Sequence, residues 1–423
     1  MQKKTSLKTR YKLIYALIIF FFISIPLKAQ NYLEPLEKRN YKELIDFYNQ
    51  YSDTDSVKTK KIVASYLKRA KKNKDTLHIA KGYLLHSYQI KDKDKNKIKY
   101  LDSTIAIIQN FKNTNHLAYA YFDKAQYFLY QERNIEKALS NLTEAHASAK
   151  ANNNEDLLYK ISYLMGIVKS EHLDEKEDAI LIYKKCAEFY NTKDDYINKF
   201  SYLYSLHAIA ETYIDIKKND STTYYNKIGY HKSQQYIDKD LHSMKTYFTL
   251  CEGINQYAKK KYTIAIDSIN TALPNILEFG DKSNTIDCYF YLGKSYTDLS
   301  KKEKAFFYFK KTDSILETLH SVPQYKHIKT YEYIKDYYKD KGDLLNQNKY
   351  LNKLNRVLDN YLKNQFIISK RVKEDYDIPL LLEEQQVLIK TLNKNTGDYI
   401  SSIQLLTLTL ISLIVLLTYP FNK

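Results

Sequence analysis

The sequence has few of the residues that make turns, with 8 Gly and 6 Pro among 423 residues. Sheets joined by tight turns and long ordered loops need both, because Gly supplies positive φ angles and Pro presets turn geometry. A chain with so few of them must change direction through short connections between helices. The composition therefore predicts an all-α protein.

Cysteine is scarce as well. Cys186, Cys251 and Cys288 fall inside helical patterns, and their spacing is not that of a metal site. An odd number allows at most one disulfide and leaves a thiol over. We expect all three to be small packing residues of the interior.

Motifs of catalysis and metal binding are missing. The ten histidines are scattered, without an H-E-x-x-H sequence, and no glycine-rich phosphate loop occurs. The stretch Asp92-x-Asp94-x-Asn96 resembles the start of a calcium loop, but Lys97 stands where glycine is needed and Ser103 where the bidentate glutamate belongs. We expect no enzyme, no cofactor and no metal site.

The formal net charge of +17 raises the question of nucleic-acid binding, because lysine and arginine neutralise phosphates. The basic residues are spread along the chain, however. The densest run, 58–74, lies on a predicted helix whose other face carries Ile62, Val63 and Tyr66. A solvated helix face is therefore the favoured interpretation of this run.

The N-terminus has the pattern of an export signal. A basic region up to Lys12 is followed by the apolar run 13–25, then by Pro26 and a small residue at Ala29. This order is typical of a signal peptide, which we expect at 1–29.

The C-terminus has the pattern of a membrane span. No charged residue occurs between Tyr399 and Asn422. We expect a transmembrane helix at 398–419, a cytoplasmic stub at 420–423 and an inner-membrane protein whose central part lies in the periplasm.

The central part repeats. Its clearest unit is Tyr289-x2-Leu292-Gly293-x2-Tyr296, followed by Ala305-x3-Phe309. This unit resembles the tetratricopeptide (TPR) repeat, with Tyr in place of the leading Trp. Small residues at Gly293 and Ala305 would let the two helices of a hairpin approach closely.

The same pattern recurs at a period near 41 residues. Ala138 and Ala179 are 41 residues apart, and Ala265 and Ala305 are 40 apart. We expect a TPR-like helical-hairpin solenoid of about seven hairpins over 75–356, preceded by capping helices over 30–74.

A solenoid offers a concave surface lined by the first helix of each hairpin, which fits a protein or peptide ligand. Aromatic residues there would serve as binding anchors or as packing between helices, and the sequence leaves both interpretations open. The candidate binding residues are Asp123, Tyr127, Tyr130, Leu250, Ile254, Tyr257, Phe290, Lys294 and Thr297.

The segment after the array, 357–397, is predicted to be helical and to lead toward the membrane. Apolar residues from Leu351 to Val372 recur at alternating steps of three and four, as in a coiled coil. Two interpretations are open: a homodimer through 351–372, or a helix that caps the exposed end of the solenoid.

Several features together resemble a known family: the signal peptide, the degenerate repeats, the stretch Tyr376-Asp377-Ile378-Pro379-Leu380-Leu381 and one membrane span. The chain resembles the sensor half of membrane-spanning AraC-type regulators of Bacteroidetes-type bacteria. The chain stops four residues after Tyr419, so we expect no helix-turn-helix and no direct nucleic-acid binding. The resemblance implies a membrane-anchored periplasmic TPR sensor for a protein, peptide or envelope ligand; the alternative is a constitutive scaffold for an envelope complex.

Overall fold

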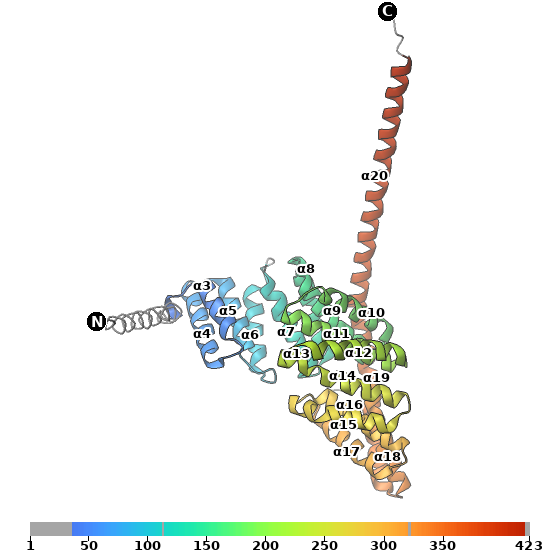
Figure 1. Cartoon of the computed structure of the whole chain (residues 1–423). Coiled ribbons are helices and arrows are strands. Elements are labelled where there is room, and N and C mark those ends of the chain that lie inside the picture. The colour runs from blue at the N-terminus through green and yellow to red at the C-terminus, as the bar shows by residue number, and fades with distance from the viewer. Residues whose placement is uncertain (1–35, 112–113, 320–322, 419–423) are drawn as a thin grey trace, which may run out of the picture. The chain divides into compact units, whose positions relative to one another are not determined.

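The computed structural model describes residues 36–111, 114–319 and 323–418 (Figure 1). Almost all of these residues are helical, and no strand occurs among them. The all-α prediction is confirmed, and the helices form a solenoid of successive antiparallel neighbours.

The helical elements of the described residues, in chain order, are η2 (Leu36–Lys38), α3 (Tyr41–Tyr51), α4 (Ser56–Lys72), α5 (Thr76–Tyr88), α6 (Asn96–Ile108), α7 (Asn115–Tyr130), α8 (Ile135–Ala151), α9 (Glu155–His172), α10 (Lys176–Asn191), α11 (Tyr196–Asp215), α12 (Asn219–Gln235), α13 (Lys239–Ser243), α14 (Lys245–Ala258), α15 (Tyr262–Phe279), α16 (Lys282–Asp298), α17 (Lys302–Thr318), α18 (Tyr325–Asp340), α19 (Leu344–Val372), η3 (Lys373–Asp377) and α20 (Ile378–Thr418).

The chain divides into two compact units. The first comprises Met1–Tyr127 and Glu144–Glu155, and the second comprises Phe128–Thr143 and Asp156–Lys423. Helices α7 and α8 each contribute residues to both units. Each unit is described separately below.

The first unit begins with a well-capped helix. The Asn40 side chain accepts a hydrogen bond from the Glu43 amide at 3.0 Å, and the Glu43 carboxylate accepts one from the Asn40 amide at 2.8 Å. This reciprocal capping box satisfies amides that the first turn leaves free. The apolar face of α4 is buried at Ile62, Val63 and Tyr66 while its lysines are mostly exposed, which confirms the solvated-face interpretation.

The second unit contains the repeat with the clearest sequence signature. A Cβ built on Gly293 of α16 would lie 2.8 Å from Cε1 of Phe309 on α17. Atoms that close overlap, so only glycine allows this approach. Ala305 is 5% exposed at the same contact, and the prediction that these two small residues bring the helices together is confirmed.

Because glycine is scarce, other residue types adopt the left-handed backbone conformation at several turns. Lys217, Lys260 and Ser300 connect successive helices with φ angles of 59°, 60° and 58°. This left-handed conformation costs a residue with a Cβ about 1 kcal/mol. The chain accepts that cost at these turns and uses glycine at Gly280 and Gly342.

The three cysteines are free thiols and are buried, as predicted. Cys251 and Cys288 belong to the hydrophobic core that runs from α11 to α19. Burial raises the pKa of all three thiols, so they pack as small apolar residues.

Most of the predicted stripe of α19 packs inside the chain, but Leu351, at its start, is 38% exposed. Ile368 and Val372 are 6% and 1% exposed, and Leu354 packs against the core of the second unit, where the neighbouring Tyr350 is also buried. The side of the helix expected to form a coiled-coil seam therefore contacts the chain's own helices. This packing favours the capping interpretation over the homodimer.

The predicted membrane span requires a correction. Within the part of the chain that the structure describes, no helix is both long and apolar enough to cross a bilayer. The expected span falls in α20, and its last residue, Tyr419, lies outside the described residues.

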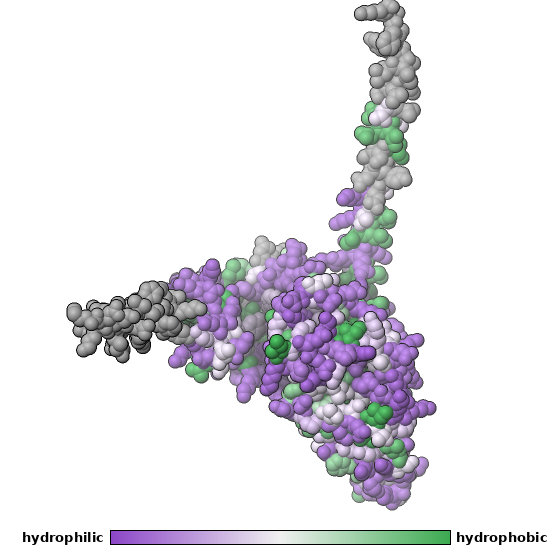
Figure 2. All heavy atoms as spheres, in the orientation of Figure 1, coloured by the Kyte–Doolittle hydropathy of each residue, from purple (hydrophilic) through white to green (hydrophobic). Residues whose placement is uncertain are grey.

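The expectations of a transmembrane helix at 398–419, and of an inner-membrane location with a periplasmic array, are therefore wrong by this finding. Figure 2 shows hydrophobic and hydrophilic side chains alternating along the described part of α20. The predicted signal peptide, 1–29, and the predicted stub, 420–423, lie outside the described residues.

Candidate functional site

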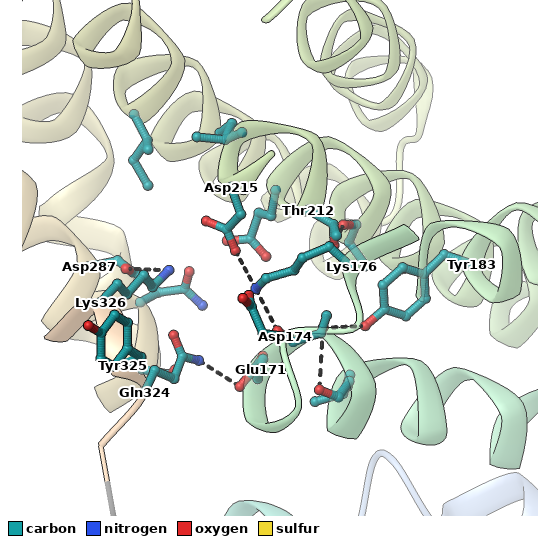
Figure 3. A pocket seen from close by; sticks show the side chains of 18 of the residues that line it. Glu171, Asp174, Lys176, Tyr183, Thr212, Asp215, Asp287, Gln324, Tyr325 and Lys326 are labelled. Atoms are coloured by element: carbon teal, nitrogen blue, oxygen red, sulfur yellow. Dashed lines mark hydrogen bonds and ion pairs between the residues drawn. The ribbon is translucent and has the colours of Figure 1, made fainter. Parts of the chain in front are cut away.

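The second unit has a cavity of about 280 Å³, partly open to solvent, between its successive helices (Figure 3). The walls come from α9, α10, α11, α14, α16, α18 and α19, together with the turn that joins α9 to α10. Residues far apart in the sequence meet there because each hairpin contributes one helix to the same side of the stack.

Charged and aromatic side chains dominate the lining. Five carboxylates and two lysines face the cavity, in a chain whose net charge is +17. The cavity is thus a local region of excess negative charge. These charged residues are Glu171, Asp174, Glu211, Asp215, Asp287, Lys176 and Lys326.

One of the two lysines, Lys176, forms an ion pair with a carboxylate at the end of the neighbouring helix α11. The Lys176 ammonium lies 2.7 Å from the Asp215 carboxylate and donates to the Ser170 carbonyl oxygen at 2.5 Å (Figure 3). The pair joins the start of α10 to the end of α11. Its two charges neutralise each other, so Asp215 adds little to the net field of the cavity.

The second lysine, Lys326, forms an ion pair with the buried carboxylate of Asp287. Asp287, 5% exposed, accepts from Lys326 at 3.0 Å and from His327 Nε2 at 2.9 Å. Burial works against its charged form, yet Lys326 and His327 outweigh burial and hold the pKa of Asp287 well below its usual range. This carboxylate is ionised and compensated.

The two glutamates of the lining, Glu171, which is exposed, and Glu211, which is half-exposed, have neutral side chains as their nearest partners. Gln324 donates to Glu171 at 2.6 Å, and His207 Nδ1 lies 3.3 Å from Glu211. Burial lowers the pKa of His207 to about 4, so its ring is uncharged at neutral pH. The cavity therefore holds carboxylates without a full compensating charge.

The electrostatics of these two groups follow from that arrangement. Burial raises the pKa of Glu211 to about 8, against the opposing attraction of Lys326. Burial also raises the pKa of Glu171. Such a carboxyl group can bind a proton and become neutral. Alternatively, a bound cation can compensate its negative charge.

Tyrosines form much of the remaining wall: Tyr163, Tyr183, Tyr291, Tyr325 and Tyr361. The Tyr183 hydroxyl shares a hydrogen bond of 3.1 Å with Ser170. Aromatic rings attract ammonium and guanidinium groups, most strongly where water is excluded. The lining thus pairs acidic groups with aromatic surface.

The residues predicted on α14 and α16 lie in different environments. Ile254 lines the cavity, whereas Leu250 and Phe290 are 0% and 1% exposed in the core. The Lys294 ammonium lies over the Tyr257 ring at 4.7 Å. Thr297 donates to the Gly293 carbonyl at 3.0 Å, a bond within its own helix.

The residues predicted on α7 fall in both units. Tyr130 belongs to the second unit and is 46% exposed. Asp123 and Tyr127 belong to the first unit, where Tyr127 is 5% exposed and Asp123 has a side-chain hydrogen bond with Tyr88.

None of the charged residues of the cavity was among the predicted binding residues. A signal for two of them exists in the sequence: Glu211 follows Ala208-Ile209-Ala210, and Asp287 lies between Ile286 and Cys288. An acidic residue inside an apolar stretch of a helix is expensive to bury without a partner. That pattern marks positions where side chains from other helices must converge.

Solved structures that are similar to this chain include the following two. The apo form of RapI is 13% identical, with a TM-score of 0.46, covering 79% of this chain and 98% of its own. Aspartyl phosphate phosphatase F from Bacillus subtilis is 13% identical, with a TM-score of 0.41, covering 74% and 92%. No family model and no curated protein matches the chain. The description of the fold rests on the chain's own helices.

Proposed function

We propose that the second unit is a non-enzymatic binding module, of TPR type, that takes a protein or peptide ligand by holding one of its positively charged groups in the cavity. The carrying observation is the imbalance of charge in the lining, five carboxylates against two lysines, in which the nearest partners of Glu171 and Glu211 are the neutral side chains of Gln324 and His207. A lysine or arginine side chain would supply the missing charge.

The cavity size fits a side chain rather than a folded partner. A volume of about 280 Å³ accommodates one long side chain with little space for more. Five tyrosines in the wall provide contact with the aliphatic stem and attraction for the charged head. The rest of the ligand would then lie along the first helices of the hairpins.

A sensing role is part of the proposal. It draws on the resemblance of the repeats and of Tyr376 to Leu381 to the sensor half of AraC-type regulators. In that role the occupied and empty cavities would give different signals to a separate output. No lining group combines a nucleophile with a base in a catalytic arrangement that we can identify among the described residues, and this supports binding rather than catalysis.

The test is a panel of short fluorescent peptides, in pairs that differ only by lysine or arginine against methionine, titrated into the full chain. We expect the basic member of a pair to bind more tightly. Glu211→Gln should weaken basic peptides by roughly tenfold or more, because losing one partner of a buried charge pair commonly costs about 2 kcal/mol.

The matched control is Glu188→Gln, which removes the same charge from an exposed position of α10 outside the cavity. It should leave the affinity for basic peptides unchanged. Equal binding of the two members of every pair, or equal loss in the two variants, would contradict the proposal.

A further inference from the structure

The long helix α19 runs along the second unit and is anchored first at α17. The Tyr350 hydroxyl donates to Asp313 at 2.6 Å, and Lys353 donates to Asp313 at 2.5 Å and to Glu317 at 2.6 Å. Tyr350 and Asp313 are 4% and 2% exposed. These buried bonds fix the N-terminal half of the helix to the last part of the solenoid.

The middle of α19 closes one side of the cavity. Tyr361 lines it, with its ring centroid 5.5 Å from that of Tyr325 on α18. Burial raises the pKa of the Tyr361 phenol, to which Asp174 of the opposite turn also contributes. A displacement of this helix would therefore open the cavity.

The turn η3, which follows α19, is held by a buried lysine. Lys169 of α9 is 3% exposed and lies 2.9 Å from Asp377, 208 residues further along the chain. The same ammonium lies 2.7 Å from Glu175 and 3.6 Å from Asp178. Burial opposes its charge, but the bonds with Glu175 and Asp377 outweigh burial and raise its pKa.

A second ion pair lies six residues before, near the end of α19. Arg371 approaches Glu136 at 2.9 Å and donates to the Ser140 hydroxyl at 2.7 Å, both on α8. Between the two pairs the helix widens into the π-helical turn η3, which places Tyr376 in the interior, 8% exposed. Such turns often mark functional positions in helices.

We propose that α19 and the turn η3 that follows it form a strap along one wall of the cavity, latched by the Asp377–Lys169 and Arg371–Glu136 pairs, and that release of this latch widens the cavity for the ligand. Release frees Tyr361 from the cavity wall and changes the direction in which α20 leaves the second unit. The latch residues are positioning residues, and the inference holds whatever group the cavity binds.

The chemistry of Lys169 suits a latch that opens. Removing the only partner of a buried charge is strongly unfavourable. Lys169 has three carboxylates nearby, so it keeps Glu175 and Asp178 when Asp377 leaves. Asp377 and Arg371 are partly exposed and regain water on release. Two arrangements of similar free energy are the requirement for a switch.

The test compares two double variants of the full chain. The latch variant is Asp377→Asn with Arg371→Gln. The matched control is Asp359→Asn with Lys363→Gln, which removes an exposed ion pair of 2.7 Å from the same helix. Hydrogen exchange of 361–377 should rise by roughly tenfold in the latch variant, the change that about 1.4 kcal/mol produces in a local opening equilibrium.

A second readout reports on the cavity itself. Ala208 lines the cavity and is 8% exposed, so a thiol at Ala208→Cys should react slowly with iodoacetamide. The latch variant should react faster, and the control should not. Unchanged exchange and unchanged alkylation in a folded latch variant would overturn the strap. If the double variant does not fold, Asp377→Asn alone carries the same expectations, since Lys169 keeps two carboxylates.

Discussion

Glu211 shows at the scale of one residue how the fold prepares the cavity for a cation. Its side chain is 37% exposed, and its nearest partner is the neutral His207. Burial raises its pKa to about 8, so at neutral pH it is mostly protonated. In the folded chain the Glu211 carboxyl group thus holds a proton, which a positively charged group of a ligand could replace.

This residue predicts a dependence of stability on pH. The pKa of Glu211 is raised from 4.5 to about 8 on folding, so the folded state binds the proton more tightly than the unfolded state. Its contribution is fully present below about pH 4.5 and is lost as the pH rises through about 8. Glu211→Gln should therefore lose less thermal stability than the parent chain between pH 5.5 and pH 8.5.

Melting curves of the two proteins at both pH values check this expectation, with Glu188→Gln as the control for removing one charge. A parent chain that loses no more stability than Glu211→Gln would contradict the assignment of the proton to this residue.

At the same scale, the turns between helices were predicted only in part. The scarcity of glycine correctly predicted helices joined by short connections. Sequence reasoning did not identify Lys217, Lys260 and Ser300 as left-handed turn residues. Lysine and serine have no preference for that conformation, and the surrounding helices impose it.

At the scale of the helix pair, small residues set the distance between neighbours. Gly293 faces Phe309, Gly253 faces Ile269, and Gly166 faces Tyr183 at 2.5 Å from a built Cβ. Each glycine lies on the first helix of a pair and meets a large side chain of the second. This repeated contact explains why the Gly-to-Ala spacing predicted the hairpins so directly.

Gly293→Ala should destabilise the chain by about 1–3 kcal/mol, the usual cost of adding a methyl group to a filled core. The double variant with Phe309→Leu should recover part of that loss, because the smaller side chain leaves room. Urea unfolding of the two single variants and the double variant gives the coupling. Simple additivity would mean that the two residues do not determine this contact.

The helix α19 marks the limit of prediction at this scale. The alternating steps from Leu351 to Val372 indicated a packed stripe, which the structure shows from Leu354 to Val372 but not at Leu351, which is 38% exposed. They did not identify what covers it, because apolar spacing is the same whether the partner is another chain or the chain's own solenoid. The partners of Tyr350 and Asp377 are Asp313 and Lys169, which no local pattern connects to them.

At the scale of the whole molecule, the repeat period was enough to predict a helical solenoid. The cavity was not predictable, because Glu171, Glu211, Asp287 and Lys326 come from four helices and meet only in the stack. The C-terminal segment was misjudged for a different reason. Its long uncharged run resembled a span, but no helix among the described residues has the length and apolarity to cross a bilayer.

The central claim is that the cavity takes a positively charged group beside Glu211. A cation favours the carboxylate over the acid, so binding at pH 7.5 should release a proton from a group whose pKa is about 8.

The most direct measurement is calorimetric titration of the full chain with the tightest lysine-containing peptide of the panel, in two buffers of different ionisation enthalpy. The account predicts a binding enthalpy that differs between the buffers, with the difference abolished in Glu211→Gln and kept in Glu188→Gln. The same binding enthalpy in both buffers for the parent chain would contradict it.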